Sequence, residues 1–218
     1  MMYPTLEKVK FVQGQRVLLK FSDGTEYRLP ENVYLELNIP LGAELTEELE
    51  HRLLSLKDYA ECKKKAMDLL ASRPQSSFQL KQKLFRNNKF SKEAIFNVIA
   101  EMEELNYLND EEYCRLYIEE SLRLKPEHGP GKIRQKLLSK GLDRALIDAN
   151  LRMFSQEPEE EYEIVKDLAH RKWKSYPDRL EFIKKKSRLY RFLAGRGFSS
   201  SVVSRVMQDF TFNGSGSD

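Results

Sequence analysis

The side chains with the clearest chemical potential are a run of cations in the C-terminal third of the chain. Residues 171–196 hold 10 Lys and Arg against 2 Asp and Glu, whereas the 218 residues together carry a net charge of only +3. A local excess of this size suggests a polyanion or an acidic protein surface as partner. A lysine-rich solvated helix face is the simpler alternative. The candidate binding residues in this run are Arg171, Lys172, Lys174, Lys184, Lys185, Lys186, Arg188 and Arg191.

Aromatic residues lie among these cations. Trp173, Tyr176 and Tyr190 could stack on bases while the cations contact phosphates, which is how proteins grip single-stranded DNA. For Trp173 a core position is favoured, because Leu168 and Ala169 stand about one helical turn away.

A second basic group surrounds the glycine-proline-glycine sequence at 129–131. Its candidate residues are Lys132, Arg134, Lys136 and Lys140. The Gly129-Pro130-Gly131 sequence stands just before a predicted helix, where open backbone N–H groups could bind a phosphate or carboxylate. Alternatively, it only turns the chain.

Three apolar patterns predict the elements that position these cations. Each pattern has five apolar positions, and successive positions are 4, 5, 5 and 4 residues apart in the second and third patterns and 4, 6, 5 and 4 residues apart in the first. Two helices with a break between them produce this spacing. The positions are Leu80, Leu84, Phe90, Ile95 and Ile99, then Ile133, Leu137, Leu142, Ile147 and Leu151, then Leu189, Leu193, Phe198, Val203 and Met207.

Each pattern contains the same turn. Asn or Gly at the break can adopt the left-handed conformation that ends a helix, and Ser91, Asp143 and Ser199 then offer N-caps for the next helix. A further helix is predicted before each pair, over 59–72, 111–124 and 161–174. Each unit is therefore expected to hold three helices around a small core.

The N-terminal segment differs from the rest. Alternating apolar residues and an Asp23-Gly24 turn predict a three-stranded sheet over roughly 6–30, ended by Pro30. A short helix near 31–37 and a helix start at Thr46 should follow.

Several function classes are not expected. Cys62 and Cys114 make neither a disulfide framework nor a metal site. Because the sequence also shows no signal peptide and no apolar stretch long enough to span a membrane, we expect a cytoplasmic protein with reduced thiols. His51, His128 and His170 have no metal-ligand spacing, and nucleophile-elbow, phosphate-loop and zinc-protease motifs do not occur. We therefore expect no enzyme, metal or cofactor.

Longer motifs resemble the RecX family of recombination regulators over nearly the whole chain. The match includes residues 105–113, the stretch 128–142 around His-Gly-Pro-Gly-Lys, residues 76–84, and the N-terminal segments 21–25 and 40–45. The first repeat departs at Asn87-Asn88-Lys89-Phe90, where a glycine turn is more usual.

Together these features predict a mainly α fold: three tandem three-helix repeats in an extended curved array, preceded by a small N-terminal β segment. The expected boundaries are 1–55 for the β segment, 56–108, 109–155 and 156–212 for the repeats, and 213–218 for a disordered tail.

The resemblance implies binding to the RecA recombinase and to its filament on single-stranded DNA, mainly inhibition of filament growth, ATPase and strand exchange, and weak binding to single-stranded DNA. A monomer without membrane contact is expected. One of the acidic runs 101–104 and 157–163 would meet a basic RecA surface, or else form a solvated face. A helix-turn-helix DNA reader and a pure protein scaffold remain the alternatives.

Overall fold

The computed structural model of the chain describes residues 3–86, 88–154 and 158–209. Within them the chain is mainly helical with one small sheet near its N-terminus, which confirms the predicted fold class. Two compact units divide the chain, Met1–Asn109 and Asp110–Asp218. The tail predicted at 213–218 lies outside the described residues, and the curved array stays a prediction.

The first unit begins with an antiparallel sheet of three strands in sequence order, β1 (Leu6–Val12), β2 (Arg16–Phe21) and β3 (Glu26–Pro30). Gly24 takes the left-handed conformation (φ 89°), and the Asp23 carboxylate accepts the Thr25 N–H at 2.9 Å, so the predicted turn forms between β2 and β3. Helix α1 (Glu31–Leu37) follows directly. These elements match the sheet and short helix predicted from the sequence.

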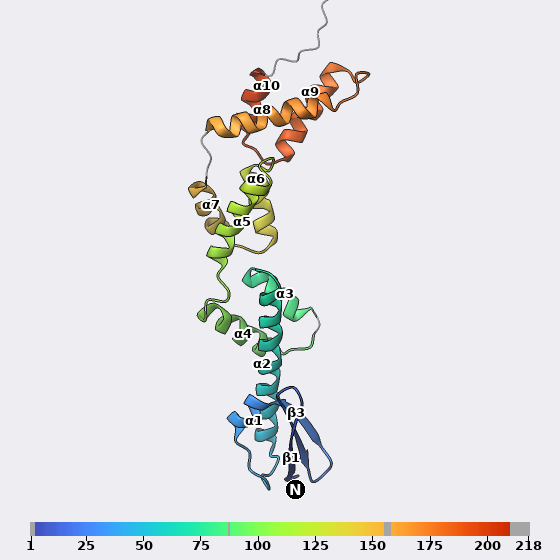
Figure 1. Ribbon diagram of the computed structural model, residues 1–218, viewed down its shortest axis with the longest axis vertical. Helices are drawn as coiled ribbons and strands as arrows, with labels where there is room; N and C mark the ends of the chain where they lie inside the picture. Colours follow the sequence, from blue (N-terminus) through green and yellow to red (C-terminus); the bar gives the residue numbers. More distant parts are fainter. Residues whose placement is uncertain (1–2, 87, 155–157, 210–218) are drawn as a thin grey trace, which may run out of the picture. The chain divides into compact units, whose positions relative to one another are not determined.

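A single long helix, α2 (Glu47–Ser72), runs from the sheet into the first three-helix group (Figure 1). Its start is confirmed, since the Thr46 hydroxyl accepts the Leu49 N–H at 3.2 Å. The helix expected over 59–72 is only the second half of α2, because no Pro or Gly interrupts the chain between Thr46 and Ser72. Leu53 packs into the sheet core, whereas Cys62 and Ala66 pack into the next core.

The first three-helix group adds α3 (Ser77–Phe85) and α4 (Lys92–Glu104) to the second half of α2. The predicted apolar positions of this group are buried, except for Phe90, which is half-buried against the same core. Ser76 forms a capping box with Gln79 at the start of α3, and the Ser91 hydroxyl accepts the Ala94 N–H at 3.1 Å at the start of α4.

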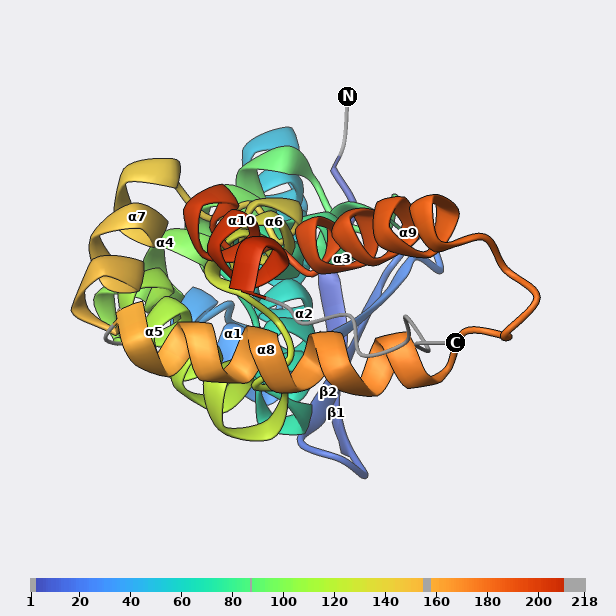
Figure 2. The ribbon, with the colours of Figure 1, turned by 90° about the horizontal axis from the view of Figure 1, so that it is seen from above.

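The second unit contains two further groups of three helices. Helices α5 (Asp110–Leu124), α6 (Pro130–Ser139) and α7 (Arg144–Met153) enclose one core. Helices α8 (Pro158–Lys174), α9 (Phe182–Gly195) and α10 (Ser200–Asp209) enclose another, and α8 and α9 run alongside each other (Figure 2). All ten apolar positions predicted for these two groups are buried.

The predicted turns and caps are also confirmed. Asn88, Gly141 and Gly197 all have positive φ, at 45°, 80° and 82°. The Asp143 carboxylate accepts the Ala145 and Leu146 N–H groups, and the Ser199 hydroxyl accepts the Val202 N–H at 3.3 Å. Each group therefore turns sharply into its last helix.

Candidate functional site

Four lysines gather around α6 and form what we term the α6 lysine cluster: Lys125, Lys132, Lys136 and Lys140. Burial, followed by repulsion from the other three ammonium groups, lowers the pKa of Lys136. A bound polyanion would relieve this repulsion. Lys125 was missed from the sequence because it follows the end of α5, outside the motif around 128–142 to which the other three belong.

The other cation predicted on α6 has a structural contact. The Arg134 Nε donates to the Asp148 carboxylate of α7 at 2.6 Å, and Arg144 lies 3.7 Å from the second oxygen of the same carboxylate. These guanidinium groups lower the pKa of Asp148. Arg134 therefore holds α6 against α7, whereas the Lys140 ammonium lies 5.1 Å from the ring centre of Tyr117, a cation–π contact on the surface of the same group.

The backbone at the start of α6 is not open for an anion. The Gly129 N–H donates to the Arg196 carbonyl at 2.9 Å and the Gly131 N–H to the Gly197 carbonyl at 2.8 Å. The Lys132 N–H bonds to the Gly129 carbonyl, and proline has no N–H. The predicted phosphate or carboxylate site at 129–131 is therefore wrong, because carbonyls from the turn between α9 and α10 already occupy its donors.

Only glycine fits where these two segments meet. A Cβ on Gly129 would lie 2.5 Å from the Phe198 backbone nitrogen, and a Cβ on Gly197 would lie 2.1 Å from the Lys132 nitrogen. Beside this contact, the Arg196 guanidinium lies 3.7 Å from the Glu127 carboxylate. We call the contact of residues 129, 131 and 197 the glycine joint. It connects the second three-helix group to the third by backbone rather than by side chains.

Some cations predicted in the third group are tucked against aromatic rings. Lys185 shares the inward stripe of α9 with Leu189 and Leu193, its side chain is only 13 % exposed, and its ammonium lies 5.8 Å from the Trp173 ring centre. Lys172 lies 5.2 Å from the ring centres of both Tyr176 and Phe192. These two lysines therefore help to cover the core.

The remaining predicted cations of this group are exposed. Arg171 pairs with Asp167 at 2.9 Å and Lys184 with Glu181 at 3.1 Å, and surface pairs of this kind are weak. The exposed set is Arg171, Lys174, Lys184, Lys186, Arg188 and Arg191.

The aromatic residues divide in the same way. Trp173 is half-buried, packs against the core and makes edge-on contacts with Tyr176 and Phe182, so its predicted core position is confirmed only in part: it lies at the margin of the core. By contrast, Tyr190 is 44 % exposed and Ile183 is 79 % exposed. Tyr190 is therefore an accessible aromatic residue on the basic helix α9.

Comparison with known protein families gives the identity of these helix groups. Residues 109–151, which cover α5, α6 and most of α7, match the second three-helix domain of RecX, and residues 159–207 match its third three-helix domain. Both matches are to successive domains of the RecX family. The glycine joint thus connects residues of the two matched family domains.

Similar proteins extend the match beyond these domains. The regulatory protein RecX of Clostridium beijerinckii is 25% identical over 179 residues, covering 82% of this chain and 81% of that protein. The regulatory protein RecX of Lactococcus lactis subsp. cremoris is 25% identical over 189 residues, covering 87% of this chain and 70% of that protein.

Solved structures show the same fold. A crystal structure of regulatory protein RecX covers 95% of this chain and 100% of its own with a TM-score of 0.75 at 23% identity. RecX from Lactobacillus salivarius gives a TM-score of 0.59 at 20% identity, over 70% of this chain and 96% of its own. Among the described residues, no helix has the length and apolar character needed to cross a membrane.

Proposed function

We propose that the chain is a cytoplasmic, non-enzymatic regulator of the RecA recombinase. It binds RecA and the RecA filament on single-stranded DNA as a monomer, and it mainly inhibits filament growth, ATP hydrolysis and strand exchange in recombination and repair. The match of two of its helix groups to successive RecX domains carries this proposal. It also binds single-stranded DNA weakly.

The cations of the second unit support contact with a nucleoprotein filament. The α6 lysine cluster and the exposed cations of α8 and α9 supply positive charge that phosphates can reach. Some carboxylates of the two acidic runs are already engaged within the protein. Glu101 bonds to Lys63, Glu159 pairs with Arg205 at 2.7 Å, and Glu161 accepts the Ser199 N–H. Glu157 of the second run lies outside the described residues.

The helix-turn-helix alternative receives less support from the charges. A major-groove reader inserts the second helix of the pair, which in this chain would be α4, α7 or α10. Residues 92–104 of α4 carry 1 cation and 4 acidic groups, α7 carries 2 cations and 1 acidic group, and α10 carries one of each. The larger positive excess lies on α6 and α9, the first helices of their pairs, so sequence-specific duplex reading is not expected.

A titration of the RecA ATPase on single-stranded DNA tests the proposal. Purified full-length chain should inhibit hydrolysis at or below one molecule per RecA and shorten the filaments. A saturating amount that leaves the ATPase and the filament length unchanged refutes the proposal.

Charge reversal separates the regulator from a pure protein scaffold. The variant K184E/K186E should weaken inhibition and binding to RecA–DNA filaments, because both lysines are exposed on α9. The matched control K8E/K10E changes the net charge equally at exposed positions of β1 and should behave as the unaltered chain. Equal behaviour of the two variants in both assays favours the scaffold.

A further inference from the structure

The first unit contains a hollow of about 540 Å³ whose walls are mostly basic. Five cations line it against two carboxylates, those of Glu61 and Asp68, and none of these five was singled out from the sequence. We call this hollow the first-unit basic cleft. Its cations come from β2, α2, α3 and the turn before α4: Arg16, Lys64, Lys65, Lys83 and Lys89.

Glu61 of α2 organises the cleft. Its side chain is only 20 % exposed and lies 3.4 Å from the Arg16 guanidinium and 3.5 Å from the Lys89 ammonium. One carboxylate thus holds the β2 end of the sheet and the turn between α3 and α4 close to α2. Because it is shared between two cations, it neutralises only part of their charge.

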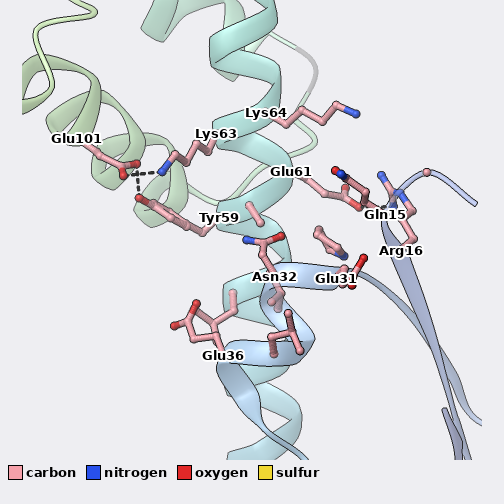
Figure 3. A pocket seen from close by; sticks show the side chains of 16 residues that line it. Gln15, Arg16, Glu31, Asn32, Glu36, Tyr59, Glu61, Lys63, Lys64 and Glu101 are labelled. Carbon is pink, nitrogen blue, oxygen red and sulfur yellow. Dashed lines mark hydrogen bonds and ion pairs between the residues drawn. The ribbon is translucent and has the colours of Figure 1, made fainter. Parts of the chain in front are cut away.

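A second hollow, of about 720 Å³, adjoins the cleft, since Arg16, Glu61 and Lys64 line both. Figure 3 shows Glu61 and Lys64 extending from α2 on the side of Arg16. Lys63, the neighbouring lysine, turns instead to the Glu101 carboxylate, which its ammonium contacts at 2.6 Å. Consecutive lysines of α2 therefore have different surroundings, one inside a hydrogen-bond network and one beside an open basic hollow.

We propose that the first-unit basic cleft binds the phosphate backbone of single-stranded DNA. Lys64 and Lys65, both exposed, make the main contacts, and Arg16 brings the N-terminal sheet into the site. Lysine ammonium groups on flexible stems suit phosphates, which recur along a strand at variable positions. The half-buried Phe90 also lines the cleft, with the Lys89 ammonium 5.5 Å from its ring centre.

This inference rests on the proposed function, in which the protein works on single-stranded DNA, and it gives that strand a site in the first unit. The N-terminal sheet gains a role through it, because Arg16 belongs to β2 and yet lines the same hollow as Lys83 of α3. An acidic protein surface is the competing occupant.

Fluorescence anisotropy of a labelled oligo(dT), measured without RecA over a series of salt concentrations, tests the site in the full chain. The variant K64Q/K65Q should bind at least tenfold more weakly at low salt. Its plot of log K against log salt should be shallower by about 1.4, since each lost phosphate contact on a single strand removes about 0.7. The control K8Q/K10Q removes the same charge from exposed positions of β1 and should change affinity less than twofold.

A substitution of Asp68 should raise the affinity for oligo(dT) rather than lower it. Its exposed carboxylate lines the cleft, so D68N should tighten oligo(dT) binding without altering the core. Weaker or unchanged binding of D68N counts against the site.

Three results overturn the inference: no oligo(dT) binding by the unaltered chain, equal binding by K64Q/K65Q and K8Q/K10Q, or a loss of RecA inhibition in K64Q/K65Q with DNA binding intact. The last result would assign the cleft to a protein surface. If the unaltered chain binds oligo(dT) through Lys64 and Lys65 but leaves the RecA ATPase unchanged, the proposed function fails and this inference stands.

Discussion

Replacing Gly197 with alanine is expected to open the glycine joint between the second and third three-helix groups. The new methyl group would lie 2.1 Å from the Lys132 backbone nitrogen and 2.8 Å from the Gly131 carbonyl carbon. Neither atom can move aside without shifting the start of α6. The two hydrogen bonds from Gly129 and Gly131 to the turn at 196–197 should therefore break.

The expected loss follows from two contributions. Placing a residue with a side chain at φ 82° destabilises the closed joint by about 1–2 kcal/mol, because the left-handed conformation brings its Cβ close to the backbone. Two backbone hydrogen bonds contribute about 0.5–1.5 kcal/mol each. The free energy that closes the joint should therefore fall by about 2–5 kcal/mol. The core of each three-helix group should persist, because residues 129, 131 and 197 belong to neither core cluster, and only the adjacent Phe198 does.

Amide hydrogen exchange, resolved residue by residue, measures the joint directly. In Gly197→Ala the Gly129 and Gly131 amides should exchange at least tenfold faster, since about 1.4 kcal/mol corresponds to a factor of ten. Gly129→Ala should act in the same direction through its 2.5 Å clash alone, because its φ of −69° suits any residue. Gly195→Ala is the control, since nothing lies within 4 Å of its added methyl group.

One outcome refutes this reasoning. If Gly197→Ala keeps both amides within threefold of the unaltered chain while Gly195→Ala does the same, the backbone contact does not hold the groups together. A general increase of exchange in the α5 to α7 core would show instead that the substitution unfolds the group rather than opening the joint.

Three further predictions concern the first unit and the buried thiols. Burial raises the pKa of Cys62 and of Cys114 to about 11, so the native thiols keep their protons at pH values where the unfolded thiols lose theirs. The free energy of unfolding, measured by urea titration, should therefore fall by about 1.4 kcal/mol per pH unit per thiol between about pH 9 and 11. A variant with both cysteines replaced by alanine should lose this part of the pH dependence. Glu101→Ala removes the acceptor shared by Tyr59 and a lysine of α2 and should cost about 1–3 kcal/mol in the same titrations, whereas a change under about 0.5 kcal/mol would contradict it. Ser91→Ala removes the N-cap of α4 and should cost about 1 kcal/mol, which Ser91→Thr should largely restore.

The local structure could be predicted from the sequence because its signals are local. At the turn into α7, the glycine Gly141, the acceptor Asp143 and the apolar Ile147 stand within a few positions of one another, and they determine the turn, the cap and the core. The sheet is similar, since Gly24 marks its second turn and Pro30 its end.

The contacts between distant segments could not be predicted in this way. Gly129 and Gly197 are far apart in sequence, and nothing beside Gly129 shows that carbonyls from another turn will occupy its donors. Arg16 and Lys89 share Glu61 for the same kind of reason, so the first-unit basic cleft has no sequence motif. Burial of Lys185 is a different case: it stands four residues before Leu189, on the predicted apolar face of α9, so the spacing carried a signal that its charge obscured.

The length of α2 has a consequence for the way this protein can be divided. At about 1.5 Å per residue its 26 residues form a rod of about 39 Å, with Leu53 in one core and Ala66 in the next. Melting of the sheet would fray the rod and remove support from the helices beyond it, so the two cores should melt in a single cooperative step. The N-terminal sheet is therefore not a detachable module. Shortening the chain within α2 would destabilise the first three-helix group, so only point substitutions can separate the role of the sheet in binding from its role in folding.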